Sequence, residues 1–213
     1  MHELIAHWIA TWFGWVRDFG YPGVVVLMAL ESTVFPVPSE VVIPPAAFWA
    51  SQGHMTISGV ILSGTLGSLI GSAISYWMAR WAGRFAIAKL GHRFFINEEK
   101  LERAERFLRL HGAGGLFFAR LLPVLRHVIS LPAGILRMDF WRFSVMTATG
   151  SAAWCGVLAW VGVRVAQRDP GLIENPEAMI AAVKHESIWF VVAVLVMAGL
   201  YALMMRMTAR RAA

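Results

Sequence analysis

The sequence is poor in charge and has almost no cysteine. Of its 213 residues only 15% are charged, whereas ordinary soluble domains carry about 25%. A soluble globular domain is therefore disfavoured. The single cysteine, Cys155, allows no internal disulfide. It stands in an apolar run, where a small buried side chain is expected.

Motifs of common enzymes and metal sites are also missing. The chain has no HExxH, no paired CxxC, no phosphate-binding glycine loop and no GxSxG. We therefore expect no metal site, no cofactor and no nucleophile with a neighbouring base, and hence no enzyme. No groove of alternating basic and aromatic residues is visible, so nucleic acid is not an expected partner.

Apolar and aromatic residues are abundant instead. The chain is 58% hydrophobic, with ten tryptophans and a net charge of +6, and its mean hydropathy is +0.60. Tryptophan favours the membrane interface, and basic residues beside apolar segments attract anionic lipid headgroups. The composition predicts an all-α polytopic membrane protein. The start of the chain lacks a basic region and a cleavage site, so no signal peptide is expected.

The chain divides into seven segments of a single membrane domain, 1–213. Two have the periodicity of amphipathic helices, and three are apolar enough to be transmembrane helices. Two further apolar stretches are interrupted by proline and charge. Because irregular backbone at membrane depth is tolerated only inside protein or beside a water-filled cavity, these two are expected to be re-entrant hairpins. The amphipathic helices are 1–19 and 97–111, the hairpins 23–53 and 115–137, and the transmembrane helices 57–81, 140–164 and 188–206.

The order of these segments predicts a repeat and an orientation. A broken, charged hairpin followed by a glycine-rich span occurs twice, which is typical of the inverted repeats of transporters. Basic residues cluster in the central loop and at the C-terminus, and the positive-inside rule places both in the cytoplasm. These residues are Arg80, Arg84, Lys89, Arg93, Arg206, Arg210 and Arg211.

Charged side chains within the two hairpins are the candidate site. Glu31 and Glu40 lie in the first hairpin, and Arg120 and Arg126 in the second. Ionisable groups inside a membrane normally face a cavity or a partner. Arginine remains charged and suits phosphate oxygens, while a glutamate in a low-dielectric cavity holds a proton more readily than in water. The alternative is a pair of structural salt bridges that closes the bundle.

Two further residues near this constellation have ordinary explanations. His127 follows Arg126 and could assist as a titrating group, but a neutral, hydrogen-bonded histidine is favoured. Asp139 precedes an expected helix and is interpreted as its N-cap.

Taken together, these motifs resemble the DedA family, whose members share the SNARE-associated or VTT domain. Glu31, Pro36, Pro38 and Glu40 match its first hairpin, and GTLGSLIGSAISYWMARWAGR, which contains Tyr76, matches its glycine-rich span. FFARLLPVLRHVISLPAGILRMDFWRF carries the F-x-x-R-x-x-P-x-x-R spacing at Phe117, Arg120, Pro123 and Arg126. The chain departs from the family pattern at Ala79, often glycine, and at Ser72, sometimes an acid.

The resemblance implies two re-entrant hairpins that face each other and a role in moving lipids between leaflets of the bacterial plasma (inner) membrane. It implies a proton-linked flippase for undecaprenyl phosphate, in which Glu31 and Glu40 couple protons and Arg120 and Arg126 hold the phosphate. Pro36, Pro38, Pro123, His127 and Tyr76 are expected to support the site. A general phospholipid scramblase and a proton-coupled antiporter for small ions or drugs stay open, as does homo-oligomerisation.

Overall fold

The computed structural model describes residues 2–33, 38–91, 98–122, 125–168 and Val192, and its secondary-structure elements are all helices. The transmembrane helix expected at 188–206 lies outside the described residues, apart from Val192. The helices are α1 (His2–Phe19), α2 (Tyr21–Ser32), η1 (Ser39–Val41), α3 (Ile43–Ser51), α4 (Ile57–Gly91), α5 (Glu98–Arg120), α6 (Leu125–Val128), α7 (Ser130–Ile135) and α8 (Phe140–Arg168).

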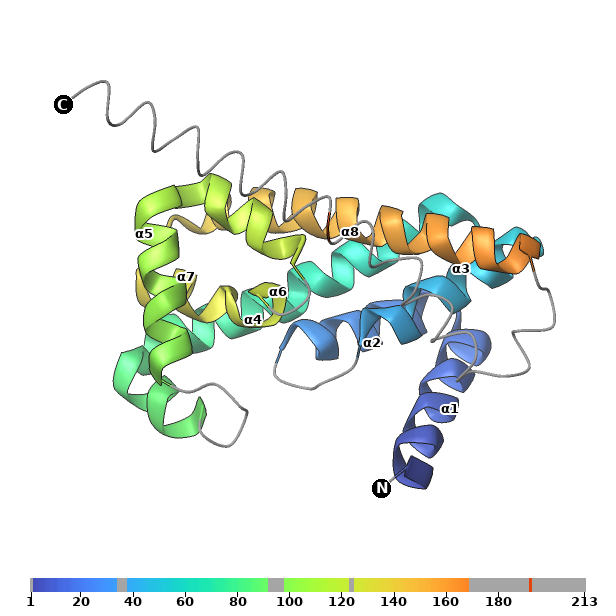
Figure 1. The fold of residues 1–213 in the computed structure, drawn as a ribbon, viewed down its shortest axis with the longest axis horizontal. Coiled ribbons are helices and arrows are strands. Elements are labelled where there is room, and N and C mark those ends of the chain that lie inside the picture. Colours follow the sequence, from blue (N-terminus) through green and yellow to red (C-terminus); the bar gives the residue numbers. More distant parts are fainter. Residues whose placement is uncertain (1, 34–37, 92–97, 123–124, 169–191, 193–213) are drawn as a thin grey trace.

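Two long helices, α4 and α8, run side by side in opposite directions through the centre of the molecule (Figure 1). Their apolar parts, Ile57–Gly83 and Phe140–Arg168, contain 27 and 29 residues. At about 1.5 Å per residue, each is long enough to cross about 30 Å of hydrocarbon. Gly83 has φ 72° and ψ 175°, so the apolar part of α4 ends there at a kink.

One face of α4 is apolar and exposed. Large apolar side chains recur there every four residues, which places them in one row along the helix. Such a continuous exposed apolar row is unusual on a soluble monomer and suits contact with lipid. The row consists of Leu62, Leu66, Ile70, Ile74 and Met78.

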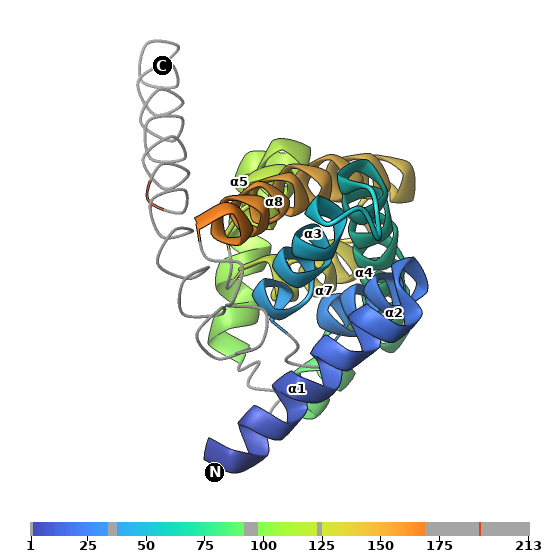
Figure 2. The same cartoon turned by 90° about the vertical axis from the view of Figure 1, so that its right-hand side faces the viewer.

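The shorter helices pack on this central pair in a swapped pattern. The first helix of each hairpin packs on the long helix that follows that hairpin, so that α2 lies on α4 and α5 lies on α8. The second helix of each hairpin packs on the other long helix, so that α3 lies on α8 and α7 on α4. In contrast, α1 extends away from the body of the molecule (Figures 1 and 2).

Glycine permits close approach at each of these four contacts. A Cβ atom added at Gly71 would lie 2.1 Å from the carbonyl oxygen of Ala29, between α4 and α2. One added at Gly134 would lie 2.2 Å from the oxygen of Tyr76, between α7 and α4. The equivalent distances are 2.6 Å from Gly162 to the Pro44 oxygen and 2.7 Å from Gly150 to Arg120 Cβ. Small residues therefore bring the hairpins against the central helices.

Proline starts helices in the first hairpin as well as interrupting them. Pro44 and Pro45 stand at the N-terminus of α3, and Pro22 stands at that of α2. Backbone N–H groups in a first helical turn have no intrahelical acceptor, so proline costs little there. Pro44 and Pro45 therefore begin α3 and do not interrupt it.

The ends of the second helices of the two hairpins share one turn. After α3, Gly53 N–H donates to Ala50 O at 3.1 Å and His54 N–H to Trp49 O at 3.1 Å. After α7, Arg137 N–H donates to Gly134 O at 3.0 Å and Met138 N–H to Ala133 O at 3.0 Å. Both are Schellman motifs, with Gly53 and Arg137 at the residue of positive φ.

A side chain then caps each long helix. Thr56 Oγ1 accepts a hydrogen bond from Gly59 N–H at 3.1 Å at the start of α4. Asp139 Oδ1 accepts one from Arg142 N–H at 2.9 Å at the start of α8. The expected N-cap role of Asp139 is confirmed. A Schellman motif followed by a side-chain N-cap thus precedes both α4 and α8.

Candidate functional site

A buried ion pair joins the two hairpins. Arg126 Nη2, in α6, donates to Glu31 Oε2, in the last turn of α2, at 3.0 Å, across 95 residues of sequence. The exposed fraction of the side chain is 3% for Arg126 and 0% for Glu31. Removing two charges from water is costly, so such a pair persists only when geometry and further hydrogen bonds compensate.

Hydroxyl groups hold the end of α2 against α4. Ser32 Oγ lies 3.2 Å from Glu31 Oε2 and 3.1 Å from Ser68 Oγ. Ser75 Oγ donates to the carbonyl oxygen of Ser32 at 3.3 Å. These buried contacts fix the end of α2 against α4, and Ser32 Oγ gives the Glu31 carboxylate a hydrogen bond in addition to the one from Arg126.

Ser39 links the ion pair to the second glutamate. Its hydroxyl oxygen accepts hydrogen bonds from Arg126 Nη1 at 3.4 Å and from Trp154 Nε1 at 3.1 Å. The same hydroxyl donates to Glu40 Oε2 at 3.5 Å. The guanidinium carbon of Arg126 also lies 5.5 Å from the centre of the Trp154 ring, at cation–π distance. Arg126 is therefore held on three sides, by Glu31, Ser39 and Trp154.

Arg120 is equally buried but is surrounded by neutral groups. Its exposed fraction is 1%. Nη2 donates to Ser130 Oγ at 2.7 Å and approaches Thr147 Oγ1 at 3.4 Å, and Nη1 donates to the carbonyl oxygen of Arg126 at 3.2 Å. Nε has no hydrogen-bond partner within the described part of the chain. No ion pair joins Arg120 to a carboxylate among these residues.

Counting only the buried side chains of the described residues, this centre holds more positive than negative charge. Two guanidinium groups are buried, while Glu31 is the buried carboxylate beside them and Glu40 is only half-buried. An uncompensated charge is costly at low dielectric. An anion that entered this centre would be stabilised by Arg120 and Arg126.

The structure brings the four predicted charged residues into one network, although not as two ion pairs. Glu31 pairs with Arg126, Arg120 reaches Arg126 through its backbone oxygen, and Glu40 reaches Arg126 through Ser39. The prediction of complementary partners across the hairpins thus corresponds to one direct pair.

The supporting residues are more scattered. Pro38 is exposed and directly precedes η1. Tyr76 lies in an aromatic cluster with Phe143, at 4.7 Å between ring centres, and its hydroxyl donates to the carbonyl oxygen of Met138. Pro36, Pro123 and the side chain of His127 lie outside the described residues.

Sequence reasoning missed the neutral residues that complete the site. Ser39 and Trp154 hold Arg126, and Ser130 and Thr147 hold Arg120. A serine next to Glu40 was the available signal for Ser39. The other three stand in apolar or mixed segments where their types are common, so no local pattern distinguishes them.

Two other features of the described residues bear on ligands. No three His, Cys, Asp or Glu side chains gather there as a metal site would require. A pocket of about 480 Å³ lies beside the C-terminal ends of α1 and α3, away from the ion pair. It is lined by Val16, Arg17, Gly20, Trp49, Gln52, His54 and Met55.

Two apolar helices of membrane-spanning length, packed beside a buried charged centre, are consistent with a helical membrane protein. Residues 37–164 match the VTT domain. The chain therefore belongs to the VTT domain family, also called the DedA family, and is a membrane protein.

Three relatives are bacterial proteins of similar length. The membrane protein YkoX of Bacillus subtilis is 34% identical over 167 residues, which cover 78% of this chain and 72% of YkoX. Undecaprenyl phosphate transporter A of the same organism is 32% identical over 184 residues, covering 84% and 90%. An alkaline phosphatase-like protein of Lactococcus lactis is 30% identical over 176 residues, covering 79% and 82%. No solved structure matches the chain significantly.

Proposed function

We propose that this protein is a transporter that moves a polyprenyl phosphate, of the undecaprenyl phosphate type, between the leaflets of a bacterial plasma membrane. Membership of the VTT domain family and the similarity to undecaprenyl phosphate transporter A support the substrate class. The buried surplus of positive charge at Arg120 and Arg126 is the observation that carries the proposal, because it favours a small, highly charged headgroup.

Arg120 is the first phosphate ligand in this proposal. Its neighbours Ser130 and Thr147 are neutral acceptors, so a phosphate oxygen can replace one of them without separating an ion pair. The planar guanidinium offers parallel N–H donors that match two phosphate oxygens. The phosphate thereby restores the charge balance of the buried centre, and the polyprenyl tail stays in lipid.

Arg126 is the second ligand, and Glu31 controls its availability. When Glu31 is ionised, its carboxylate occupies Nη2 of Arg126. When Glu31 is protonated, its charge disappears and Nη2 becomes available for a phosphate oxygen. Glu40 couples to the same guanidinium through the Ser39 hydroxyl. Proton binding and phosphate binding are linked by this exchange.

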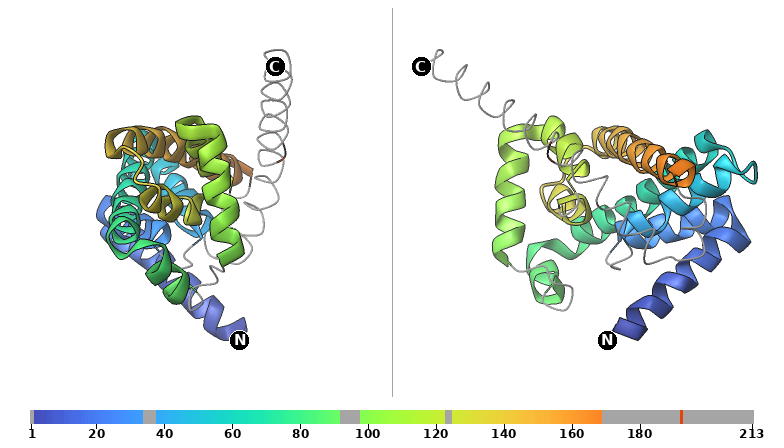
Figure 3. Two further views of the ribbon diagram at one scale, coloured as in Figure 1. Left: turned by 90° about the vertical axis from the view of Figure 1, so that its left-hand side faces the viewer. Right: turned by 45° about the vertical axis from the view of Figure 1, so that its right-hand side comes forward.

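The hairpins α2–α3 and α5–α7 are re-entrant in this proposal, and the two units form an inverted repeat. The swapped packing on α4 and α8 and the matching Schellman motifs support the repeat. The antiparallel course of α4 and α8 in Figure 3 agrees with opposite orientations of the two units. The central loop and the C-terminus are assigned to the cytoplasm because basic residues flank them.

The decisive experiment measures lipid movement directly. Purified full-length protein is reconstituted into sealed liposomes that contain fluorescent polyprenyl phosphate, and an impermeant phosphatase is added outside. The fraction of lipid that becomes accessible is followed for the wild type and for Arg120→Ala and Arg164→Gln. Arg164 is an exposed arginine of α8 that stacks on Trp160, which makes it a matched control for charge.

Faster access to inner-leaflet lipid in the wild type and in Arg164→Gln, but not in Arg120→Ala, is the expected result. Equal acceleration for zwitterionic phospholipid, independent of pH, would favour a scramblase. Transport of a water-soluble cation or drug without lipid movement would favour an antiporter. Release of phosphate from the lipid by purified protein alone would favour a phosphatase. Each of these outcomes overturns the proposed function.

A further inference from the structure

The two matching Schellman motifs differ at one residue. Gly53 has φ 86° in the turn between α3 and α4, and Arg137 has φ 51° in the turn between α7 and α8. Arg137 is the one non-glycine residue of positive φ in the described part of the chain. Glycine adopts this conformation without steric cost, whereas a side chain such as arginine is strained there. The Arg137 side chain thus stands where the backbone alone favours glycine.

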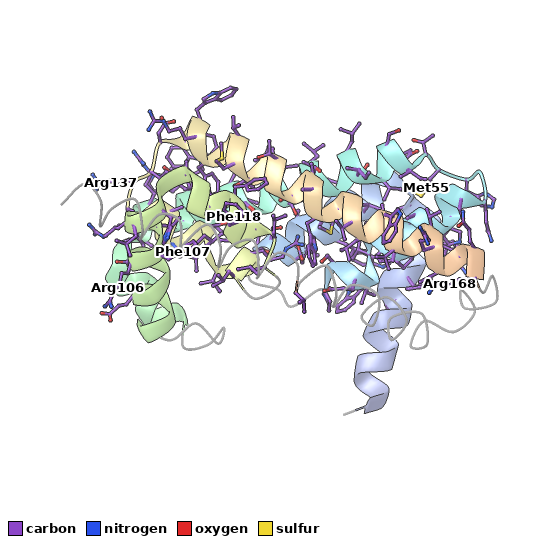
Figure 4. The ribbon with its side chains drawn as sticks, turned by 45° about the horizontal axis from the view of Figure 1, so that its top comes forward. Met55, Arg106, Phe107, Phe118, Arg137 and Arg168 are labelled. Carbon is purple, nitrogen blue, oxygen red and sulfur yellow. The ribbon has the colours of Figure 1, made fainter. Side chains whose placement is uncertain are left out.

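The Arg137 side chain is exposed at the end of the molecule opposite to Met55 and Arg168 (Figure 4). Arg142, in the first turn of α8, is exposed beside it in sequence. Arg80, near the end of the apolar part of α4, joins the same region because its Nη1 donates to Tyr76 Oη at 2.9 Å. That phenolic oxygen in turn donates to the carbonyl oxygen of Met138, the neighbour of Arg137.

Exposed tryptophans accompany these arginines. Trp81 is 79% exposed on α4, and Trp141 is 74% exposed on α8. The Arg80 guanidinium carbon also lies 5.5 Å from the centre of the Trp77 ring. Tryptophan rings concentrate at the depth of lipid headgroups. The exposed tryptophans therefore favour a position of the three arginines at the depth where phosphates of the bilayer lie.

The local carboxylate does not neutralise this patch. Asp139 is exposed, and its Oδ1 accepts the hydrogen bond from Arg142 N–H that caps α8. No ion pair joins Asp139 to Arg80, Arg137 or Arg142 within the described residues. Three guanidinium groups stand against one carboxylate, which gives the patch a net positive charge.

We propose that Arg80, Arg137 and Arg142 form a binding site for the phosphate headgroup of an anionic bilayer phospholipid. The site lies at the junction of α4, α7 and α8. It is separate from the buried centre of Arg120 and Arg126 and does not depend on lipid transport. The strained backbone at Arg137 is explained by the ligand, because a glycine at this position would form the same turn but could not contact a phosphate.

The strained backbone at Arg137 makes the variant Arg137→Gly a selective test. Arg137→Gly removes the guanidinium and relieves the backbone, so this variant keeps the fold. Arg142→Gln removes a second charge from a helical position, and Arg137→Lys keeps the charge in the same turn. Arg164→Gln removes one charge from the other end of α8 and serves as the control. Arg120→Ala reports on the central site.

Native mass spectrometry of the full-length protein in detergent, titrated with phosphatidylglycerol or phosphatidylcholine, measures the binding of individual lipids. One basic residue at an anionic surface contributes about 1 kcal/mol, which is roughly a five-fold change in affinity. Arg137→Gly and Arg142→Gln are expected to weaken the first phosphatidylglycerol by about five-fold. Arg137→Lys and Arg164→Gln are expected to stay within about two-fold of the wild type, and phosphatidylcholine binding is expected to be weak in all.

The proposal is overturned if Arg137→Gly and Arg142→Gln bind phosphatidylglycerol as the wild type does, or if Arg164→Gln loses as much. If the larger loss occurs in Arg120→Ala, the lipid binds at the central site and the proposal is also overturned. Should Arg137→Gly fail to fold, the comparison of Arg142→Gln with Arg164→Gln decides. None of these measurements requires transport. A negative result would therefore not contradict the proposed function, which the liposome experiment tests separately.

Discussion

Gly20 and Gly112 adopt nearly the same unusual backbone conformation, with φ and ψ of 57° and −130° at Gly20 and 55° and −139° at Gly112. Gly20 separates α1 from α2, and Gly112 divides α5 between its charged first part and its apolar second part. Each glycine therefore redirects the chain from an amphipathic helix into the first helix of a hairpin. Residues with a Cβ atom strongly disfavour this region.

Alanine at either glycine is expected to destabilise the protein through the backbone alone. An added Cβ at Gly20 or Gly112 meets no atom within 4 Å, so no clash contributes. The expected loss is about 1 to 2 kcal/mol for each variant, measured by denaturation in mixed micelles. Gly156→Ala is the control, because Gly156 has equal space but lies inside α8, where alanine is favourable by about 0.5 to 1 kcal/mol. Equal stability of all three variants would contradict the explanation.

The contributions of Glu31 and Arg126 to the free energy of unfolding are expected to be coupled. Glu31→Gln leaves the Arg126 guanidinium buried without its carboxylate, and breaking a buried pair costs about 3 to 5 kcal/mol. The double variant Glu31→Gln/Arg126→Gln removes both charges and is expected to be more stable than Arg126→Gln alone. A double-mutant cycle on the free energy of unfolding measures this coupling. Additive losses would mean that the 3.0 Å contact contributes nothing to the fold.

Removing the hydroxyl partner of Arg120 is expected to reduce transport less than removing the guanidinium itself. Ser130→Ala removes the 2.7 Å acceptor of Nη2 but leaves the positive charge, and a hydrogen bond to a charged group contributes about 1.5 to 3 kcal/mol. Transport in the liposome assay should fall by roughly ten- to one-hundred-fold in Ser130→Ala and disappear in Arg120→Ala. Arg120→Lys keeps the charge without the planar fork and should lie between them. Full transport by Arg120→Ala would remove this residue from the site.

Binding of the phosphate headgroup is expected to depend on pH through the proposed exchange at Glu31. In the proposed exchange, a proton on the Glu31 carboxylate frees Nη2 of Arg126 for a phosphate oxygen, so phosphate binding is expected to increase with proton concentration. Glu31→Gln imitates the protonated carboxyl, so its headgroup binding should persist at every pH and its dependence on pH should disappear. The affinity of the protein for the phosphate headgroup is measured as a function of pH, with the wild type and the variant in one and the same detergent. Loss of binding together with loss of pH dependence would contradict the exchange.

Adding a single methyl group at the glycine contacts between helices is expected to destabilise the protein. Gly71→Ala and Gly134→Ala would place Cβ atoms 2.1 and 2.2 Å from backbone oxygens of Ala29 and Tyr76. Because backbone cannot move as a flexible side chain does, each variant should lose about 1 to 3 kcal/mol. Thermal unfolding in detergent measures the loss, with Gly14→Ala as the control because nothing lies within 4 Å of its added Cβ. Unchanged melting of both variants would show that α2 and α7 do not pack on α4 as described.

Much of this architecture is readable from local patterns. Continuous apolar runs predict spanning helices at 57–81 and 140–164, because both length and hydropathy are local properties. The structure has apolar helices at Ile57–Gly83 and Phe140–Arg168. Charged residues between prolines identify Glu31 and Arg126 as unusual for the same reason. The place of Pro44 and Pro45 at the start of α3 is not readable in this way, because whether a proline breaks or starts a helix depends on where that helix begins.

The neutral part of the site could not be predicted in this way. Ser39 and Trp154 are separated by 115 residues, and their contact depends on how α3 packs on α8. Ser and Trp are also common near membrane interfaces, so neither type is informative without its neighbours. The same holds for Ser130 and Thr147 around Arg120.

Residue order alone predicts the membrane class, two apolar segments interrupted by proline, and the four charged residues within them. Charge inside an apolar segment is visible without coordinates. The folded structure is needed to establish that Glu31 pairs with Arg126 and that Arg120 has neutral neighbours. It also decided that Arg137 occupies the turn position at which the first unit has Gly53. These relationships depend on contacts between segments distant in sequence, and the packing of α2, α6 and α7 around α4 and α8 selects them.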